Sequence, residues 1–300
     1  MKPGGDPVDV VVVTWNSAET LGALLDSLPA GMGATDWAVI VADNGSSDDT
    51  LALLAGRTAK ARILRLNENC GFAAAANRAL AQTRPQSDVL MLNPDVRLGP
   101  GAATRMLAEL RAGEGIGIVG PRTLGTGGEL QPTLRCEPSI PRALAEAAIG
   151  VRLAGRLGWA ETVLAPQAYR RSTVADWISG AALLISRRCL AACGELDESF
   201  FLYSEDTEYA LRAADRGFAS RLAPTALVTH LGGESRTDPA LWTRLVLNKL
   251  TLYRRRHGPL RAGGFWLAAV LRELRFAVTG NRASFAAARA LLRRPRSARR

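Results

Sequence analysis

The first half of the chain alternates between short apolar runs and segments with helical periodicity. The first run, Asp9–Trp15, contains four consecutive valines, and the second, Trp37–Asp43, is nearly as apolar. Such runs are typical of parallel strands that are buried on both faces of a sheet. The same reasoning predicts strands at Ala61–Leu66, Asp88–Asn93 and Gly115–Pro121, and helices at 18–28, from Asp48 onward, at Phe72–Gln82 and at 100–111. The alternation predicts an α/β fold with a parallel sheet between helices, and with ligands at the carboxyl ends of the strands.

The pattern is less regular after residue 121. We expect a hairpin turn at Gly125–Gly128, helical or mixed structure at 141–157 and a mobile loop at 158–173. A strand at Ala175–Ser186, interrupted by Gly180, should follow, and then a carboxylate-rich helix at 204–216. Short strands are expected at 218–222 and 226–230, and two or three helices from Pro239. We expect the loop at 158–173 to close when a ligand binds, because a site for an activated substrate must exclude water. Alternatively, this segment is an ordinary surface loop.

Positive charge is concentrated near the C-terminus. The net charge is +10, but residues 236–300 hold 16 Lys and Arg against Asp238 and Glu273, while residues 1–235 hold 22 basic and 26 acidic residues. We therefore expect a mildly acidic body, 1–235, and a basic helical extension, 236–300. Gly263–Thr279 is too short and too charged to cross a bilayer, yet it suits a helix lying among lipid headgroups. The alternative is that these helices pack on the body and that the Arg cluster at 293–300 is solvated.

The cysteines and the N-terminus indicate the compartment. Cys70, Cys136, Cys189 and Cys193 form no Cys-x-x-Cys pair, so we expect free thiols in a reducing cytoplasm. The first residues lack the apolar stretch of a signal peptide, and no segment has about 18 uninterrupted apolar residues. We therefore expect the chain to stay on the cytoplasmic side of the membrane.

Short polar groups gather at the expected ends of three strands. The first turn, Thr14-Trp15-Asn16, has no glycine, which argues against a dinucleotide-binding Gly-x-Gly-x-x-Gly loop, and no P-loop is present. Asp43 ends the second strand, and Asn93-Pro94-Asp95 ends the fourth. A carboxylate at such a position can hold a divalent cation against a diphosphate, although Asn-Pro-Asp is also an ordinary turn.

Seven motifs follow one another in order over residues 8–257. They are Val11-Val12-Val13-Thr14-Trp15-Asn16, Ala42-Asp43-Asn44-Gly45-Ser46-Ser47-Asp48, Asn69-Cys70-Gly71-Phe72 with Asn77, Leu92-Asn93-Pro94-Asp95-Val96, Trp177-Ile178-Ser179-Gly180-Ala181, Phe200-Phe201-Leu202-Tyr203-Ser204-Glu205-Asp206, and His230-Leu231-Gly232-Gly233-Glu234-Ser235. Together they resemble glycosyltransferase family 2, in its bacterial rhamnosyltransferase-like branch. The resemblance implies a GT-A fold with a mixed, mainly parallel central sheet over residues 1–235.

The resemblance also implies roles for individual residues. The expected nucleotide-sugar site comprises Thr14, Trp15, Asn16, Asp43, Asn69, Gly71, Asn77, Asn93 and Asp95. Asp95 and His230 match ligands of a divalent cation, Mn²⁺ or Mg²⁺, although Asn93 stands where many relatives have a second Asp. Asp206 matches the catalytic base, with Glu205 as its neighbour, and Trp177 and Gly180 match the acceptor or donor pocket.

The cluster of carboxylates at 205–208 also suggests a catalytic role on chemical grounds, without the resemblance. Sugar transfer from a nucleotide diphosphate needs a base near the acceptor hydroxyl, and direct attack on the anomeric carbon inverts its configuration. Glu205, Asp206 and Glu208 lie within four residues, so their mutual repulsion should raise at least one pKa. Alternatively, these acids only cap a helix, His230 is a buried structural histidine, and Trp177 and Gly180 are core and turn residues.

Three functions are compared on this basis. The favoured one is an inverting, metal-dependent glycosyltransferase that moves a sugar from a donor such as dTDP-rhamnose or a UDP-sugar to a cell-surface glycan or a polyprenyl-linked acceptor. A sugar-1-phosphate nucleotidyltransferase would need a Gly-rich, basic signature after the first strand, which is missing. A nucleic-acid-binding protein would explain the basic extension, but the body is acidic and lacks a recognisable RNA-binding motif. We therefore expect no nucleic-acid partner, and a peripheral position on an anionic membrane surface through residues 260–300.

Overall fold

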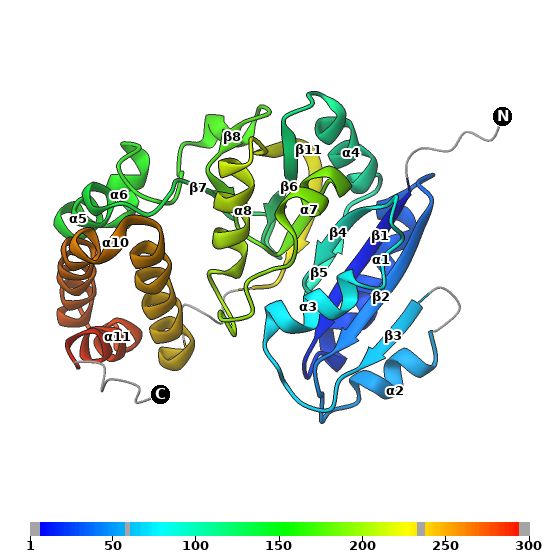
Figure 1. Ribbon diagram of the computed structural model, residues 1–300, viewed down its shortest axis with the longest axis horizontal. Coiled ribbons are helices and arrows are strands. Elements are labelled where there is room, and N and C mark those ends of the chain that lie inside the picture. The colour runs from blue at the N-terminus through cyan, green and yellow to red at the C-terminus, as the bar shows by residue number, and fades with distance from the viewer. Residues whose placement is uncertain (1–6, 58–60, 233–237, 294–300) are drawn as a thin grey trace. The chain divides into compact units, whose positions relative to one another are not determined.

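The computed structural model describes residues 7–57, 61–232 and 238–293 (Figure 1). By its internal contacts the chain divides into two compact units. The sheet unit comprises the residues up to Arg135, Pro166–Phe201 and Glu205–Leu231. The helical unit comprises Cys136–Ala165, Leu202–Ser204 and the residues from Gly232 onward. Residues 136–165 therefore pack with the C-terminal helices, whereas the sequence analysis assigned them to the body.

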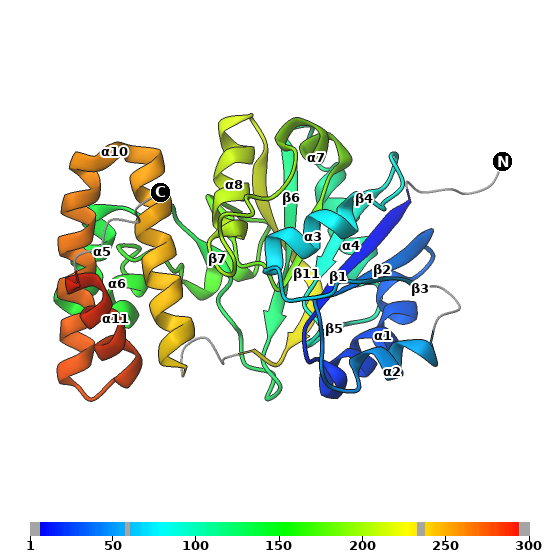
Figure 2. The ribbon, with the colours of Figure 1, turned by 60° about the horizontal axis from the view of Figure 1, so that its bottom comes forward.

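The sheet unit contains a mixed, mainly parallel sheet, as expected from the sequence. Its strands are β1 (Val8–Thr14), β2 (Trp37–Asp43), β3 (Ala61–Arg65), β4 (Asp88–Leu92), β5 (Val96–Leu98), β6 (Ile116–Leu124), β8 (Val174–Ala175), β10 (Ala182–Ile185) and β11 (Ala219–His230). The order is β3-β2-β1-β4-β10-β6-β11-β5, and β8 pairs with β11. Strands β1 to β4 pair in parallel, β10 runs antiparallel between β4 and β6, and β11 is parallel to β6 (Figure 2).

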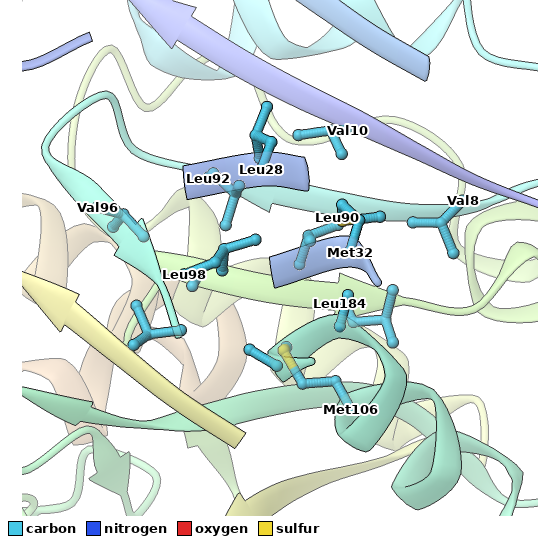
Figure 3. Close-up of a cluster of buried hydrophobic side chains, with 14 of the residues drawn as sticks. Val8, Val10, Leu28, Met32, Leu90, Leu92, Val96, Leu98, Met106 and Leu184 are labelled. Atoms are coloured by element: carbon cyan, nitrogen blue, oxygen red, sulfur yellow. The ribbon is translucent and has the colours of Figure 1, made fainter. Parts of the chain in front are cut away.

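Helices cover both faces of this sheet. They are α1 (Ala18–Met32), α2 (Thr50–Ala55), α3 (Phe72–Leu80), α4 (Ala102–Arg111), α7 (Arg187–Cys193) and α8 (Glu205–Asp215). Val8 and Val10 of β1 lie in one cluster with Leu28 and Met32 of α1 and Met106 of α4 (Figure 3). The alternate valines of β1 point to the opposite face, since side chains alternate along a strand, and α3 contacts β1 there. The all-valine run is thus explained by burial on both sides.

Two predicted elements differ from the structure after residue 170. The strand expected at Ala175–Ser186 is three short strands with different partners: β8, β9 (Trp177–Ile178) and β10, with β9 pairing with β7 (Leu134–Arg135) in a separate small sheet. The two strands expected at 218–230 form the single strand β11, with an irregularity between Ala223 and Leu227. Local pattern located the apolar segments correctly, but strand pairing decided where each one ends.

The loop expected at 158–173 has an anchor within it. Pro166–Tyr169 forms a short 3₁₀ helix, and the buried Tyr169 hydroxyl accepts a hydrogen bond of 3.0 Å from the backbone N–H of Leu134. Burial raises the pKa of Tyr169, so its hydroxyl stays neutral. Ligand-induced closure of this loop stays a prediction.

The helical unit consists of α5 (Ile140–Ile149), α6 (Val151–Arg156), α10 (Pro239–Val278) and α11 (Arg282–Leu292). Helix α10 breaks at Gly258, whose φ of +79° is accessible to glycine at little cost, just before Pro259. Tyr253 and Phe265, on either side of the break, stack with ring centroids 4.2 Å apart. Among the residues described, no helix combines the length and the apolar character that a membrane span needs.

Candidate active site

The carboxyl ends of β1 and β2 hold two buried polar side chains together. The parallel register places Thr14 beside Asp43. The Thr14 hydroxyl donates a hydrogen bond of 3.1 Å to Asp43 Oδ1, and the Ser46 hydroxyl donates one of 2.6 Å to the same oxygen. The backbone N–H of Ser46 donates to Asp43 Oδ2 at 3.1 Å. The Asp43 carboxylate is therefore held at a defined orientation at the strand end.

Trp15 and Asn16 form the rim of this region. The Trp15 side chain is 55% exposed. Asn16 has a left-handed φ of +51°, its backbone N–H donates to Ser46 Oγ at 2.9 Å, and its side-chain oxygen accepts from the backbone N–H of Ser47 at 2.8 Å. These bonds join the loop after β1 to the loop after β2, so Asn16 positions the rim and leaves the Trp15 ring exposed.

An asparagine pair links the β2 end to the loop before α3. Asn44 donates from Nδ2 to Asn69 Oδ1 at 2.9 Å, and its own oxygen accepts from the backbone N–H of Cys70 at 3.0 Å. Gly71 has a φ of +91°, and a Cβ there would lie 2.6 Å from the carbonyl oxygen of Phe201. Asn69 and Gly71 thus fix the loop, and Asn44 is a member of this network that the sequence analysis left out of the site.

Asn77 connects α3 to another part of the sheet unit, away from the ends of β1 and β2. Its Nδ2 donates to the carbonyl oxygen of Leu196 at 2.9 Å, and its Oδ1 accepts from the N–H of the same residue at 2.9 Å. The side chain is buried. This two-point bond ties α3 to the segment after α7, which is a positioning role.

Asp95 and His230 meet although they lie far apart in the sequence. Strand β5, which the sequence analysis did not predict, pairs antiparallel with β11 and places His230 opposite Val96. His230 Nε2 lies 3.2 Å from Asp95 Oδ2. Asn93 is nearby in the chain, where its backbone N–H donates to the carbonyl oxygen of Ala181 at 2.9 Å. The structure therefore brings together the two predicted cation ligands.

Gln131 fixes the orientation of the His230 ring. Gln131 Nε2 lies 2.9 Å from the carbonyl oxygen of His230, and Gln131 Oε1 lies 3.1 Å from His230 Nδ1. A carbonyl oxygen only accepts, so the amide nitrogen must face it, and the amide oxygen must then face Nδ1. Since that oxygen also only accepts, Nδ1 carries the hydrogen. In neutral His230 the lone pair on Nε2 therefore faces the Asp95 carboxylate.

This arrangement fits a divalent cation. A lone pair and a carboxylate repel one another unless a proton or a metal ion lies between them. Neighbouring ligands about 2.1 Å from an octahedral ion lie about 3 Å apart, close to the separation of Nε2 and Oδ2. Within the described ranges no group of three or more His, Cys, Asp or Glu could hold a metal.

Asp206 lies in the first turn of α8, where Gly180 approaches its side chain. The N–H of Gly180 donates to Asp206 Oδ2 at 3.0 Å, and the N–H of Thr207 donates to Oδ1 at 2.7 Å. Burial raises the pKa of Asp206, while these two N–H groups and the positive charge of Arg135 oppose the rise. The result is a carboxylate held at both oxygens in a site that favours taking up a proton.

Glu205 is a buried carboxyl group beside Asp206. Its Oε2 atom has no hydrogen-bond partner. Burial, and then the negative charge of Asp206, raise the pKa of Glu205 to about 8. Glu205 is therefore largely protonated at neutral pH. The repulsion expected from the sequence therefore contributes to the raised pKa of Glu205, and burial is the larger cause.

Trp177 and Arg135 lie opposite one another on β9 and β7. The Arg135 guanidinium carbon is 5.6 Å from the centroid of the Trp177 ring, within the range of a cation–π contact. The sequence analysis did not single out Arg135, because no motif marks it; only the β7–β9 pairing places its charge near Trp177 and Asp206. Gly233, Glu234 and Ser235 of the last motif lie outside the described residues.

Comparison with known proteins identifies the family of this chain. The N-acetylglucosaminyl-diphospho-decaprenol L-rhamnosyltransferase of Mycobacterium tuberculosis is 31% identical over 248 residues, which cover 78% of this chain and 80% of the relative. Residues 9–154 match the profile of glycosyl transferase family 2. The chain belongs to glycosyltransferase family 2. The resemblance in the seven motifs is confirmed, and the nucleotidyltransferase and nucleic-acid-binding alternatives are set aside.

Solved glycosyltransferases share the fold of this family 2 enzyme. The mannosyltransferase PcManGT from Pyrobaculum calidifontis, in complex with GDP-Man and Mn²⁺, has a TM-score of 0.59 at 16% identity and covers 96% of this chain and 78% of its own. S. aureus TarS 1–349 with UDP-GlcNAc has a TM-score of 0.55 at 15% identity and covers 90% of this chain and 71% of its own. At such low identity these likenesses establish the GT-A fold alone.

Proposed function

We propose that this family 2 glycosyltransferase moves a rhamnosyl group from a nucleotide diphosphate, dTDP-rhamnose in the first instance, to a polyprenyl-diphosphate-linked N-acetylglucosamine. The observation that carries the proposal is the 31% identity, over 78% of the chain, to an enzyme named for that transfer. Such a product belongs to the assembly of a cell-surface glycan. A UDP-sugar is the alternative donor.

In this proposal the strand ends of β1 and β2 bind the donor. Asp43 and Thr14 contact the base or ribose, with the Asp43 carboxylate accepting hydrogen bonds from it, and the exposed Trp15 ring stacks beside them. Asn16, Asn69, Gly71 and Asn77 act by holding the loops around the pocket. The support is the buried Thr14–Asp43 hydrogen bond at the strand ends, the Asn44–Asn69 bond in the loop before α3, and the bond from Asn77 to the backbone of Leu196.

Asp95 and His230 would hold Mn²⁺ or Mg²⁺, with Asn93 beside them. A bound cation neutralises the negative charge that develops on the leaving diphosphate. The chain's own contribution is to keep the Nε2 lone pair and the Asp95 carboxylate on one side, 3.2 Å apart. Asn in place of Asp at position 93 removes one anionic ligand, which makes the diphosphate itself an important part of the site.

Asp206 acts as the base in a single displacement. The acceptor hydroxyl oxygen forms the new bond to the anomeric carbon, the bond from that carbon to the diphosphate oxygen breaks, and the hydroxyl proton passes to Asp206. One base without a covalent intermediate gives inversion. Glu205 stays protonated, so it does not compete for this proton, and Trp177 and Gly180 line the pocket beside the base.

The enzyme acts at the inner face of the cell membrane, with the sheet unit carrying the catalytic groups and residues 236–300 as a basic extension toward an anionic surface. The support for a membrane location is the polyprenyl-linked acceptor named for the relative. No nucleic-acid partner is proposed.

The test combines ligand binding with transfer. Thermal shifts are measured with dTDP, dTDP-rhamnose, UDP-GlcNAc and GDP-mannose, with and without Mn²⁺, because a ligand that binds only the folded state raises Tm. Transfer is assayed with a short-chain, water-soluble analogue of prenyl-diphospho-N-acetylglucosamine, and NMR determines the anomeric configuration. We expect a cation-dependent shift with dTDP-rhamnose and an inverted rhamnosyl product. A shift and transfer with another donor only, or a retained configuration, would contradict the proposal.

A further inference from the structure

The C-terminal helical hairpin has an unusual surface. We use hairpin for Pro259–Val278 of α10 together with α11; the indole N–H of Trp266 donates to the carbonyl oxygen of Leu291 at 2.9 Å, and Ala269, Val270 and Ala287 pack between the two helices. The inner side is thus closed by small apolar residues. The outer side should be polar if water alone covers it.

The outer side is instead apolar and basic. Its exposed large apolar residues are Leu260, Leu267, Leu271, Leu274, Val278, Phe285 and Leu292. The five on α10 are spaced by seven, four, three and four residues, so they form one stripe along the helix. The exposed charged side chains among the described residues of the hairpin are Arg261, Arg282, Arg289 and Arg293.

The acidic residue of the hairpin is turned inward. Glu273 is 1% exposed and accepts a hydrogen bond of 2.8 Å from the indole N–H of Trp242, and it also contacts Arg272. Arg272 in turn donates to Glu146 at 2.7 Å, and Arg275 donates to carbonyl oxygens at the end of α5. Glu273, Arg272 and Arg275 therefore form contacts inside the helical unit. The exposed side chains described on the outer surface of the hairpin are apolar or positively charged.

We propose that this outer face of the hairpin docks on an anionic phospholipid bilayer. The inference rests on the proposed function only for the membrane-bound acceptor. Its other support is the apolar and basic character of this surface. Leucine, valine and phenylalanine side chains enter the acyl boundary, while arginines contact phosphate groups. A second copy of the chain is a poorer occupant, because a symmetric contact would place the four arginines of one copy near those of the other.

The test uses the full chain and sedimented vesicles of phosphatidylcholine alone or mixed equally with phosphatidylglycerol. The apolar variant is Leu267→Ser with Leu271→Ser and Leu274→Ser; the basic variant is Arg261→Gln with Arg282→Gln and Arg289→Gln. The control combines Val174→Ser and Arg188→Gln, an exposed apolar and an exposed basic residue of the sheet unit. Circular dichroism and Tm verify that each variant is folded.

We expect the wild type and the control to bind the anionic vesicles and to lose binding as salt rises, and each hairpin variant to bind at least about tenfold more weakly. Wild-type protein that ignores anionic vesicles, or hairpin variants that bind as the wild type does, would overturn the proposal. A wild-type dimer that the apolar variant converts to a monomer would assign the face to a second copy. Wild-type transfer to the water-soluble acceptor is measured separately, so a failure of the proposed function is distinguished from a failure of docking.

A second observation, the bonding of Gln131, carries an independent inference. We infer that Gln131 is a positioning residue of the cation site, because its amide meets both the carbonyl oxygen and the Nδ1 atom of one residue, His230. That pair of bonds selects the tautomer whose Nε2 lone pair faces Asp95. Partners of metal-binding histidines commonly contribute about 10–100-fold to metal affinity.

The test is Gln131→Leu, with Gln167→Leu as the matched control because Gln167 is exposed in the short 3₁₀ helix Pro166–Tyr169. The chain has two histidines, so ¹⁵N spectra can be assigned with His257→Gln. We expect hydrogen on Nδ1 of neutral His230 in the wild type, a shift toward Nε2 in Gln131→Leu, and Mn²⁺ binding with dTDP, followed by electron paramagnetic resonance, that is about 10–100-fold weaker. Hydrogen on Nε2 in the wild type, or unchanged Mn²⁺ affinity in the variant, would refute the role.

Discussion

Replacing Gly180 with alanine probes how closely the backbone must approach the proposed base. A Cβ at position 180 would lie 3.1 Å from Asp206 Oδ2 and 3.2 Å from Asp206 Cβ. These contacts are tighter than ordinary van der Waals separations, so Asp206 must retreat by a few tenths of an ångström. The hydrogen bond of 3.0 Å from the Gly180 N–H to Oδ2 then lengthens.

The size of the effect follows from how far the base is displaced. A misplacement of about 1 Å can cost about 100-fold in rate, so a retreat of Asp206 by a few tenths of an ångström lowers kcat by about 4–10-fold. The N–H also stabilises the charged form of Asp206, so its loss raises the pKa of that carboxyl, and the acid limb of the kcat profile moves to higher pH.

The assay is steady-state transfer to the soluble acceptor across pH, with donor affinity measured by titration. Donor affinity should be unchanged, because Gly180 acts through the base. Gly22→Ala is the matched control, since a Cβ there would meet Leu53 Cδ1 at an ordinary 3.5 Å. A Gly180→Ala enzyme with kcat within about twofold of the wild type and an unmoved acid limb would refute the reasoning.

Three further predictions concern the carboxylates. Asp206→Asn should abolish transfer while nucleotide-sugar affinity stays nearly intact, and transfer within a few-fold of the wild type would remove Asp206 from the catalytic role. Asp95→Ala should weaken cation-dependent nucleotide binding, so an undiminished rise of affinity on adding Mn²⁺ would exclude Asp95 as a ligand. The pKa of Glu205 is raised from its ordinary 4.5 to about 8, so the folded state favours its protonated form, and the associated stability is present below about pH 4.5 and lost as pH rises through about 8. The Tm of Glu205→Gln minus that of the wild type should therefore be larger near pH 9 than near pH 4. A Tm difference that does not change with pH would contradict the raised pKa of Glu205.

Local sequence pattern determined the strands and helices of the first 120 residues of this enzyme, with the exception of the short strand β5. The valine run of β1 is buried on both faces, and a strand in that position needs no information from the rest of the chain to be recognised. The motifs at Thr14, Asp43, Asp95 and Asp206 were likewise recognisable from the sequence, because each is a short run of residues at a turn or a helix start.

Tertiary structure alone decided which of these residues meet. His230 reaches Asp95 because β5 pairs with β11, and Gln131, in the segment after β6, reaches His230 at the end of β11. Apolar periodicity reports that a segment is buried, but it does not report its pairing partner, since partner and register depend on contacts between residues far apart in the chain. For the same reason the sequence predicted an interfacial helix at Gly263–Thr279 but not which of its apolar residues are exposed, because Leu271 and Val270 look alike and only packing buries one of them.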